Sequence, residues 1–476
     1  MLNRDYLLEI FELIQVIKME NILTSEDKCK INQIIKKEFE SSTIHAIPNI
    51  IRNKSYFFKF FWTFWFIASS GVCLWFMSES IITFFDYEVV NKISAVNKMS
   101  IEFPTVTICN LNFATSNFSS DLYEEIKNET YLDISQISYS SNKTTSEFTD
   151  QSFYLLKNYL FMLLAKSKAK LKGPSYVKKL GLSLNEMLIV CLFNAQICSE
   201  NDFEYFYSYN YGNCFKFNYA NDKFASNNGK DYGLVLQLYV APSSFFSVYD
   251  GLTIFIGDKD YDLTTTEGID APTGFSTNVA IQRVTTESQP KPYSECTENL
   301  SISEDYDSLD YKLSVKNNNP YNRGFCFRMC FRKYLENNCN CTDSIDFSYY
   351  GIKPCLSIAE LQCTYNAYSS FINNKVYEEA NSCDCPIKCK ITNYFTTVSL
   401  SKFPSLNYAN VLLKNPNVIS KLPNATFESL KENILSFNVY YNDLTQVTIS
   451  ESPKILLPDL IANLGGTLGL FLGKIS

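Results

Sequence analysis

The feature that most constrains this chain is an apolar run that no charged residue interrupts. It extends over 19 residues, from Phe60 to Ser78, between Lys59 and Glu79. About 20 apolar residues form a helix that crosses a bilayer, whereas a core helix of a globular protein is rarely apolar on every side. The run is too long for a cleaved signal peptide, and a polar-rich segment precedes it. We therefore predict a transmembrane helix at residues 57–82.

The charges beside this run predict its orientation. The preceding flank is basic and the following flank is acidic, with Arg52, Lys54 and Lys59 before the run and Glu79, Asp86 and Glu88 after it. Because positively charged flanks remain in the cytoplasm, residues 1–56 should be cytoplasmic and most of the remaining chain extracellular. The expected location is the plasma membrane, with more than one membrane segment.

The cysteine content agrees with an extracellular body. Of the 16 cysteines, Cys29 would be cytoplasmic and Cys73 would lie in the membrane, which leaves an even number, 16 − 2 = 14, outside the cell. An oxidising compartment favours disulfides, although Cys339 and Cys341 would also be compatible with an all-cysteine metal site. Six N-x-S/T sequons are candidate glycosylation sites: Asn117, Asn128, Asn142, Asn299, Asn340 and Asn424.

Composition argues against several function classes. The single histidine, His45, disfavours Cys/His zinc modules and Ser-His or Cys-His catalytic pairs. The chain has no G-x-S-x-G, Walker or H-E-x-x-H motif. A net charge of −8 argues against nucleic-acid binding, which usually requires a basic surface. We therefore expect neither an enzyme, nor a cofactor, nor a nucleic-acid partner.

The presumed extracellular sequence mixes strand-like and helix-like segments, so the expected fold class is α+β. Alternating or β-branched runs predict strands at Ser100–Leu111, Asn213–Asn218, Leu234–Val240 and Phe437–Thr448. Apolar spacing predicts helices at Asp150–Leu171, Leu182–Phe193 and Phe325–Leu335.

Ten of the fourteen extracellular cysteines lie within residues 296–389. Two of them, Cys326 and Cys330, are four residues apart, so on a helix their disulfides would leave from the same face. So many crosslinks suit an extended segment that has little core of its own. The spacing alone leaves the pairing of these cysteines open.

Five motifs occur in a fixed order: FPTVTICN (Phe103–Asn110), GNCFKFN (Gly212–Asn218), LENNCNC (Leu335–Cys341), CDCPIKC (Cys383–Cys389) and LGGTLGLFLG (Leu464–Gly473). Each motif is weak alone, but the five together resemble the degenerin/epithelial sodium channel family, which includes acid-sensing and peptide-gated channels. The resemblance covers nearly the whole chain, from Ser42 to Gly473.

The resemblance implies a homo- or hetero-trimer of hand-like subunits. An extracellular domain at residues 83–456 would contain a β palm, finger and knuckle helices and a thumb at about 296–389, between the first membrane helix and the start of a second at 457–476. The runs at Ser100 and Phe437 would be palm strands that continue into the membrane helices. The implied disulfides are Cys109–Cys214, Cys191–Cys198, Cys296–Cys389, Cys326–Cys385, Cys330–Cys383, Cys339–Cys363 and Cys341–Cys355.

The resemblance also implies pore residues in the second membrane helix. Gly465, Gly466 and Gly469 would let three helices approach closely around an axis, although each glycine is also compatible with an ordinary packed helix. Asp459 would lie at the outer mouth, where three copies concentrate cations, or would be a residue that begins the helix.

The selectivity filter departs from the family's Gly-x-Ser pattern. Gly473 and Ser476 are separated by two residues, one of which is Lys474. A lysine inside a bilayer costs about 2.5–3.5 kcal/mol unless it faces water or a partner. Residues 460–473 would form only about 21 Å of helix, so we expect either a gene product that continues further or a short subunit that assembles with complete ones.

A gating segment is implied before the first helix. STIHAIPNI (Ser42–Ile50) resembles the family's His-Gly segment, in which His45 is retained and Ala46 replaces glycine. Alanine disfavours a positive φ, so gating would be altered if the family backbone needs one. Tyr87, just outside the first helix, would couple the thumb to the membrane or would only pack there.

These features predict a subunit of a sodium-selective, amiloride-sensitive cation channel that is gated through its extracellular domain. A truncated, non-conducting modulatory or binding subunit with the same ectodomain is the alternative. The expected partners are sodium ions, related channel subunits and the lipid bilayer.

Overall fold

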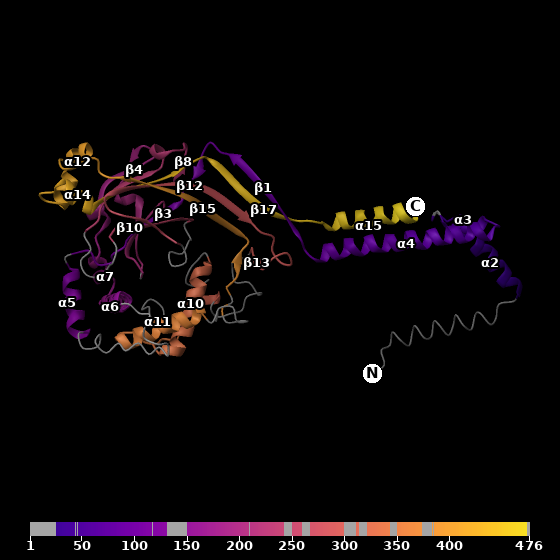
Figure 1. The fold of residues 1–476 in the computed structure, drawn as a ribbon, viewed down its shortest axis with the longest axis horizontal. Coiled ribbons are helices and arrows are strands. Elements are labelled where there is room, and N and C mark those ends of the chain that lie inside the picture. The colour runs from indigo at the N-terminus through magenta and orange to yellow at the C-terminus, as the bar shows by residue number, and fades with distance from the viewer. Residues whose placement is uncertain are drawn as a thin grey trace. The chain divides into compact units, whose positions relative to one another are not determined.

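The computed structural model of the chain describes residues 25–42, 44, 46–116, 118–130, 150–208, 210–241, 250–258, 267–298, 311–313, 321–342, 350–373, 383 and 385–473 (Figure 1). The chain divides into two compact units, which are named here the helical unit (Met1–Val90 and Ser452–Ser476) and the sheet unit (Asn91–Glu451).

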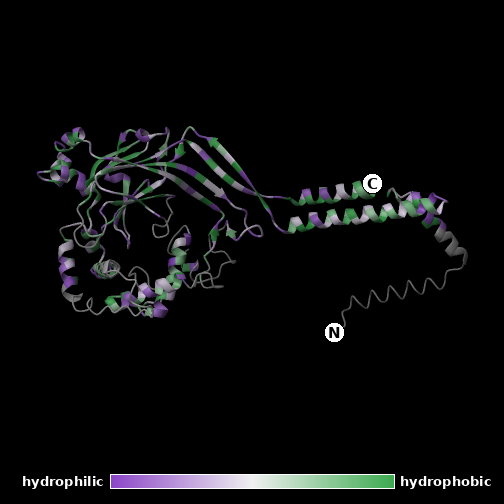
Figure 2. Ribbon diagram, in the orientation of Figure 1, coloured by the Kyte–Doolittle hydropathy of each residue, from purple (hydrophilic) through white to green (hydrophobic). Residues whose placement is uncertain are grey.

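The helical unit contains α2 (Ser25–Glu40), α3 (Ala46–Arg52), α4 (Tyr56–Phe85) and α15 (Leu457–Leu472). Helix α4 has 30 residues, which corresponds to about 45 Å, and it includes the whole uncharged run. Hydrophobic residues occur along its length (Figure 2), and Cys73 is its one buried residue. Within the described ranges, α4 is the one helix long and apolar enough to cross a membrane, and α15 is a shorter apolar helix.

The larger sheet has eight strands. Its order is β1 (Val89–Asn97), β17 (Thr445–Pro453), β12 (Phe275–Glu287), β16 (Ile434–Tyr441), β9 (Leu234–Tyr239), β4 (Leu188–Phe193) and β5 (Gln196–Ile197), and β15 (Lys390–Lys402) also pairs with β12. Strand β12 is antiparallel to β15 from Phe275↔Lys402 to Glu287↔Lys390. It runs parallel to β16 and then to β17, so one long strand organises the sheet.

The second sheet has five strands in the order β11 (Ile269–Ala271), β10 (Leu252–Gly257), β3 (Thr105–Asn110), β7 (Gly212–Phe217) and β6 (Phe203–Ser208). All six residues of β3 are buried, and β10 and β7 pair with it on its two edges. One apolar core joins the two sheets and includes Phe103, Phe217, Leu236 and Phe437. Two short pairs complete the strands: β2 (Ile101–Glu102) with β8 (Phe224–Ala225), and β13 (Cys296–Thr297) with β14 (Ile387–Lys388).

Helices pack on these sheets in separate groups. Among the described residues, the sheet unit has the helices α5 (Ser119–Thr130), α6 (Asp150–Leu171), α7 (Pro174–Leu180), α8 (Leu184–Met187), α10 (Arg323–Cys339), α11 (Ile358–Asn373), α12 (Leu406–Leu412), α13 (Pro416–Lys421) and α14 (Phe427–Asn433), with short 3-10 turns at Glu200–Asp202 and Lys230–Tyr232. Residues of α5, α6, α7 and α11 share one core, and α12, α13 and α14 share another. Helices α10 and α11 pack together (Figure 1).

Two backbone segments approach each other so closely at Gly233 that the position requires glycine. A Cβ atom on Gly233 would lie 2.1 Å from the carbonyl oxygen of Val439 in β16. Real Cβ atoms do not come this near to an oxygen, so only glycine fits where the chain enters β9.

Two sequence predictions are wrong. Leu182–Phe193 is not one helix, because helix α8 ends at Met187 and the β-branched residues that follow form β4, which pairs with β9. The run at Ser100–Leu111 does not continue from the first membrane helix either. Strand β1 (Val89–Asn97) follows α4, and most of the run forms β3 in the second sheet. The helix at Asp150–Leu171 has the predicted bounds.

Candidate functional site

Helices α4 and α15 pack along each other within the helical unit. The rings of Phe76 and Phe471 stack with their centroids 5.9 Å apart, and the Sγ atom of Cys73 lies 3.9 Å from the carbonyl oxygen of Thr467. Leu460 is the one buried residue of α15. Because Leu460, Thr467 and Phe471 are seven and four residues apart, they share one face of the helix.

The glycines of α15 lie on the opposite face. At about 100° per residue, Gly465, Gly466 and Gly469 lie within roughly 60° of the direction that points away from the α4 contact. A Cβ atom added at any of the three would meet no atom within 4 Å. The chain therefore leaves a strip of small residues on α15 uncovered.

The ends of α15 have distinct chemistry. The Oδ2 atom of Asp459 accepts a hydrogen bond from the backbone N–H of Leu456 at 3.2 Å, which is a helix-capping contact. The side chain is also exposed, so capping leaves the carboxylate open to solvent. Gly473 follows the helix with a φ of 106°, a conformation that favours glycine. Lys474 and Ser476 lie outside the described residues.

The segment before α4 lies against the C-terminal end of α15. Ala46 begins α3 with helical backbone geometry, not with a positive φ. Together with Ile44, Phe61 and Trp65 it lines an apolar cavity of about 380 Å³, to which Phe471 also contributes. The structure therefore brings the predicted gating residue Ala46 close to the end of the pore candidate helix.

The other two predicted gating residues are His45 and Tyr87. His45 lies outside the described residues. Tyr87 follows α4 with a φ of 51°, which is uncommon for a residue with a side chain. Its ring packs edge-to-face against that of Phe85, 6.4 Å away. Tyr87 therefore forms a sharp turn immediately after the long apolar helix.

Seven disulfides crosslink the sheet unit. They are Cys109–Cys214, Cys191–Cys198, Cys296–Cys389, Cys326–Cys385, Cys330–Cys383, Cys339–Cys363 and Cys341–Cys355, the same pairs that the resemblance implies. Five of them lie in the segment 296–389. One joins α10 to α11 (Cys339–Cys363), and two join α10 to the chain after α11 (Cys326–Cys385 and Cys330–Cys383). Cys341–Cys355 closes the connection between α10 and α11, and Cys296–Cys389 joins β13 to the residue after β14. Cys73 is buried and free.

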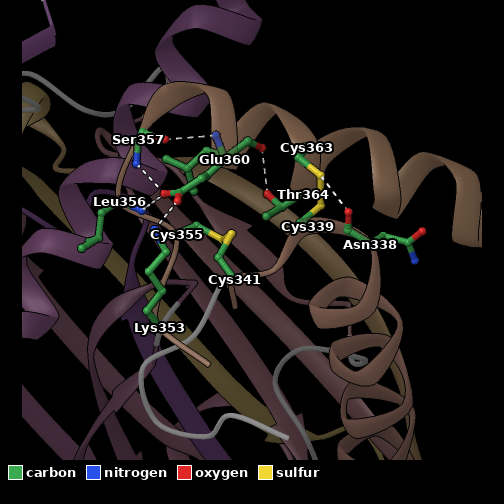
Figure 3. The surroundings of a disulfide bond; sticks show 11 residues. Asn338, Cys339, Cys341, Lys353, Cys355, Leu356, Ser357, Glu360, Cys363 and Thr364 are labelled. Carbon is green, nitrogen blue, oxygen red and sulfur yellow. Dashed lines mark hydrogen bonds and ion pairs between the residues drawn. A yellow bond between two sulfur atoms is a disulfide. The ribbon is translucent and has the colours of Figure 1, made fainter. Parts of the chain in front are cut away.

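The start of α11 is fixed next to two of these disulfides (Figure 3). The carboxylate of Glu360 accepts hydrogen bonds from the Lys353 ammonium at 2.6 Å and from the backbone N–H groups of Leu356 and Ser357 at 2.8 and 3.1 Å. Burial opposes ionisation of this carboxyl, but the hydrogen bonds outweigh it and lower the pKa of Glu360 to about 2. The helix start therefore carries a permanent negative charge at neutral pH.

A polar network crosses the interior of the sheet unit. Arg283 of β12 pairs with Glu102 of β2 at 2.7 Å, and the Tyr441 hydroxyl donates to the backbone carbonyl of Glu102 at 2.6 Å. The Tyr394 hydroxyl donates to Asp258 at 3.3 Å. Burial raises the pKa of both tyrosines, so their hydroxyls remain protonated donors.

A buried lysine lies in helix α6. The Nζ atom of Lys166 donates to the carbonyl oxygen of Asn210 at 2.5 Å and lies over the ring of Phe113 at 5.3 Å. Desolvation by burial lowers the pKa of Lys166 to about 7. Sequence reasoning missed this residue, although a lysine within the apolar stretch LFMLLAKSKAKL was a visible signal.

Two of the six sequons can be placed with their side chains. Asn340 and Asn424 are exposed, and both have a positive φ, 52° and 60°. Asn128 belongs to α5, and Asn117, Asn142 and Asn299 lie outside the described residues. Among the described residues, no group of three or more His, Cys, Asp or Glu side chains is arranged to hold a metal ion.

Comparison with known proteins gives one consistent result. The family model described as "Amiloride-sensitive sodium channel" matches residues 39–474. The chain is 26% identical over 465 residues to the bile acid-sensitive ion channel of Mus musculus, which covers 91% of this chain and 83% of that protein.

Two further relatives have different printed names. Acid-sensing ion channel 2 of Rattus norvegicus is 26% identical over 456 residues, with 91% of this chain and 82% of that protein covered. Epithelial sodium channel subunit gamma-2 of Xenopus laevis is 29% identical over 306 residues, with 62% of this chain and 44% of that protein covered.

Proposed function

Because this chain belongs to the amiloride-sensitive sodium channel family, we propose that it is a subunit of a sodium-selective, amiloride-blocked cation channel that is gated through its extracellular domain. The family consists of ion channels, so the chain is not an enzyme. The proposal places α4 and α15 in the plasma membrane and the sheet unit outside the cell, with residues 1–56 in the cytoplasm.

The observation that carries the pore assignment is the uncovered glycine strip of α15. A sodium pore needs a narrow path in which protein oxygens replace part of the hydration shell of the ion. Helices approach each other closely where small residues face the contact. In our proposal, copies of α15 from three subunits meet along Gly465, Gly466 and Gly469, and α4 supports each copy from outside.

The residues at the two ends of α15 have proposed roles in this pore. Asp459 has an exposed carboxylate at the start of the helix, and three such carboxylates at the outer mouth would concentrate cations. Gly473 and Ser476 would contribute to the selectivity filter, and Lys474 would have to face away from the ion path. Ala46 and His45 belong to the proposed gate, because Ala46 lines the cavity at the end of α15.

The proposed gating path runs through the backbone. Strand β1 begins three residues after Asp86 in the sequence, and β17 ends shortly before α15. The two strands pair with each other in the larger sheet. A rearrangement of the disulfide-crosslinked sheet unit, in which segment 296–389 would act as the thumb, would therefore pull on both membrane helices, with Tyr87 at the turn.

The test uses the native coding sequence expressed in oocytes, alone and with acid-sensing ion channel 2. We expect Gly469→Leu to remove or strongly reduce the current while the amount of protein at the surface stays the same, because a large side chain would separate the helices. Leu464→Met is the control, since Leu464 lies about 140° around the helix from Gly469 and is three or four residues from none of the glycines. Equal currents from both variants would refute the glycine-lined pore.

The same experiment tests the alternative function, a non-conducting modulatory subunit. If the chain carries no current of its own, and Gly469→Leu leaves unchanged the effect that the chain has on the current of its relative, then the chain is a non-conducting modulatory subunit.

A further inference from the structure

The sheet unit contains a cavity of about 470 Å³ that the proposed pore and gate do not use. Its walls come from β10 and β11, from the first residues of α10, and from β14 with the adjoining part of β15 (Figure 1). The lining residues extend from Ile254 to Thr396 in the sequence, so no single sequence motif identifies the cavity. Ligand pockets of proteins typically have volumes of about 300–1,000 Å³.

The apolar part of the lining is aliphatic. Five isoleucines contribute to it: Ile254, Ile256, Ile269, Ile387 and Ile391. Two of them retain much exposure in the folded chain, 37% for Ile387 and 39% for Ile391. Exposed aliphatic surface in a concave site gains stability when an apolar group covers it. Tyr394 is the one aromatic residue among the described lining residues, and its hydroxyl is bonded to Asp258. The five isoleucines make up most of the apolar lining, so the complementary ligand body is aliphatic.

Two cations on one wall have no anionic partner among the described residues. Arg323, the first residue of α10, donates from Nε to the carbonyl oxygen of Cys385 at 3.2 Å, and its guanidinium lies over the Phe327 ring. Lys388 of β14 makes no ion pair with any described carboxylate. Lys390, in contrast, is paired with Glu287 at 2.7 Å. A carboxylate can therefore approach Arg323 and Lys388 without displacing an existing ion pair.

The lining also carries two negative charges. Asp258 accepts the hydrogen bond of the Tyr394 hydroxyl, and Glu267 is exposed. The lining contains three cations (Arg323, Lys388, Lys390) and two carboxylates, and the charge of Lys390 is already compensated by Glu287. A carboxylate therefore fits beside Arg323 and Lys388, whereas a negative charge near Asp258 or Glu267 would be repelled.

We propose that this cavity binds an aliphatic carboxylate of the fatty-acid class, with its hydrocarbon chain on the isoleucines and its carboxylate between Arg323 and Lys388. The proposal concerns binding to the sheet unit and is independent of ion conduction, so a chain that carries no current would still be expected to bind.

The experiment measures protection of an introduced thiol on membranes from cells that express the full chain. Ile391→Cys places a reporter in the lining, and Thr396→Cys is a second reporter in case the first variant does not fold. Labelling by a biotin maleimide is followed with and without dodecanoate below its micellar concentration, and labelling of the wild-type chain is subtracted. We expect dodecanoate to slow labelling at either lining position at least about fivefold.

Matched controls separate the site from general detergent effects. Val398→Cys lies on the same strand, outside the lining, and is 44% exposed, so its labelling should not change. Dodecanol and dodecyltrimethylammonium share the chain of dodecanoate but lack its charge, and they should protect at least tenfold less well. Arg323→Gln combined with Lys388→Gln should raise the half-protecting dodecanoate concentration about tenfold or more, because hydrogen bonds to charged groups are among the stronger ones. Lys402→Gln, outside the lining, should not.

Several results would overturn the proposal. They are an absence of protection at both lining positions, equal protection by the neutral or cationic amphiphile, equal slowing at Val398→Cys, and an unchanged half-protecting concentration in the double glutamine variant.

Discussion

The ammonium group of Lys166 lies 2.5 Å from the carbonyl oxygen of Asn210, and this contact joins helix α6 to the turn between β6 and β7. Burial lowers the pKa of Lys166 to about 7, whereas an unfolded lysine titrates near about 10.4. Between these two values the unfolded chain binds more protons than the folded chain. The free energy of unfolding should therefore rise with pH from about 7 to 10, and the cost of the buried charge is complete below this window.

The variant Lys166→Met removes this titration. We expect the free energy of unfolding of this variant, relative to that of the wild-type chain, to increase as the pH is lowered from 10 to 7. The difference should change by up to about 1.4 kcal/mol per pH unit. Thermal melts of the solubilised full chain measure this difference. Lys414→Met, at an exposed position, should keep the wild-type slope. Parallel curves for wild type and Lys166→Met would contradict the buried-lysine account.

Glu360 gives a prediction with the opposite sign. Its folded pKa of about 2 lies below the unfolded value of about 4.3, so its stabilisation is present above pH 4.3 and is lost as the pH falls towards 2. Glu360→Gln should destabilise the chain by about 1–3 kcal/mol at pH 7, because the Lys353 ion pair is lost and two backbone contacts are weakened.

Melting curves at pH 7 and near pH 3 test this prediction, since the difference between wild type and Glu360→Gln should shrink at the lower pH. Glu428→Gln is the matched control, because Glu428 also lies in the first turn of a helix but has a 73% exposed side chain paired with Lys431. If Glu428→Gln lost as much stability as Glu360→Gln, the hydrogen bonds and ion pair of Glu360 would not account for its effect.

Gly233→Ala should destabilise the sheet unit by about 3 kcal/mol or more, the upper end of the usual cost of overpacking. The new methyl group would meet a backbone carbonyl of β16, which cannot move aside as a flexible side chain would. Gly71→Ala is the control, since Gly71 has open space around its Cβ position and no positive φ. The fraction of protein that reaches the cell surface reports the difference, and equal fractions would argue against the close approach.

Two disulfides with very different loops should differ in importance. Cys109–Cys214 closes 105 residues and joins directly opposite positions of β3 and β7, whereas Cys191–Cys198 closes seven. Loop-closure entropy predicts a contribution of about 4.7 kcal/mol for the first and about 2.4 kcal/mol for the second. Paired serine substitutions at each disulfide, compared by thermal melts, should show this order, and the reverse order would contradict it.

The sequence predicted those parts of the fold that depend on local patterns. Helix α6 could be predicted from its apolar spacing, and α4 from an uncharged run long enough to cross a bilayer. The segment Leu182–Phe193 could not, because Ser183 and Glu186 form a capping box that starts a helix, while the next residues are β-branched and pair with β9. The helix ends at Met187 because the residues that follow pair with β9, a strand far away in the sequence.

The candidate functional site could also be predicted only in part from the sequence. The glycines of α15 and the fourteen cysteines of the sheet unit could be found in the sequence, and the family resemblance supplied the pairing of the cysteines. The ion pair between Arg283 and Glu102 joins positions 181 residues apart, and the isoleucine cavity joins four segments. Such contacts follow from strand order in the sheets, which no periodicity within one segment encodes.

The central claim is that this chain contributes to a sodium-selective pore. The most direct measurement is the reversal potential of the current in oocytes that express the native coding sequence with acid-sensing ion channel 2, while external sodium is replaced by potassium and amiloride is applied. We predict an amiloride-blocked current whose reversal potential follows external sodium and whose amplitude falls with Gly469→Leu. A current that is carried equally by potassium, or that ignores both amiloride and the Gly469→Leu substitution, would contradict the account.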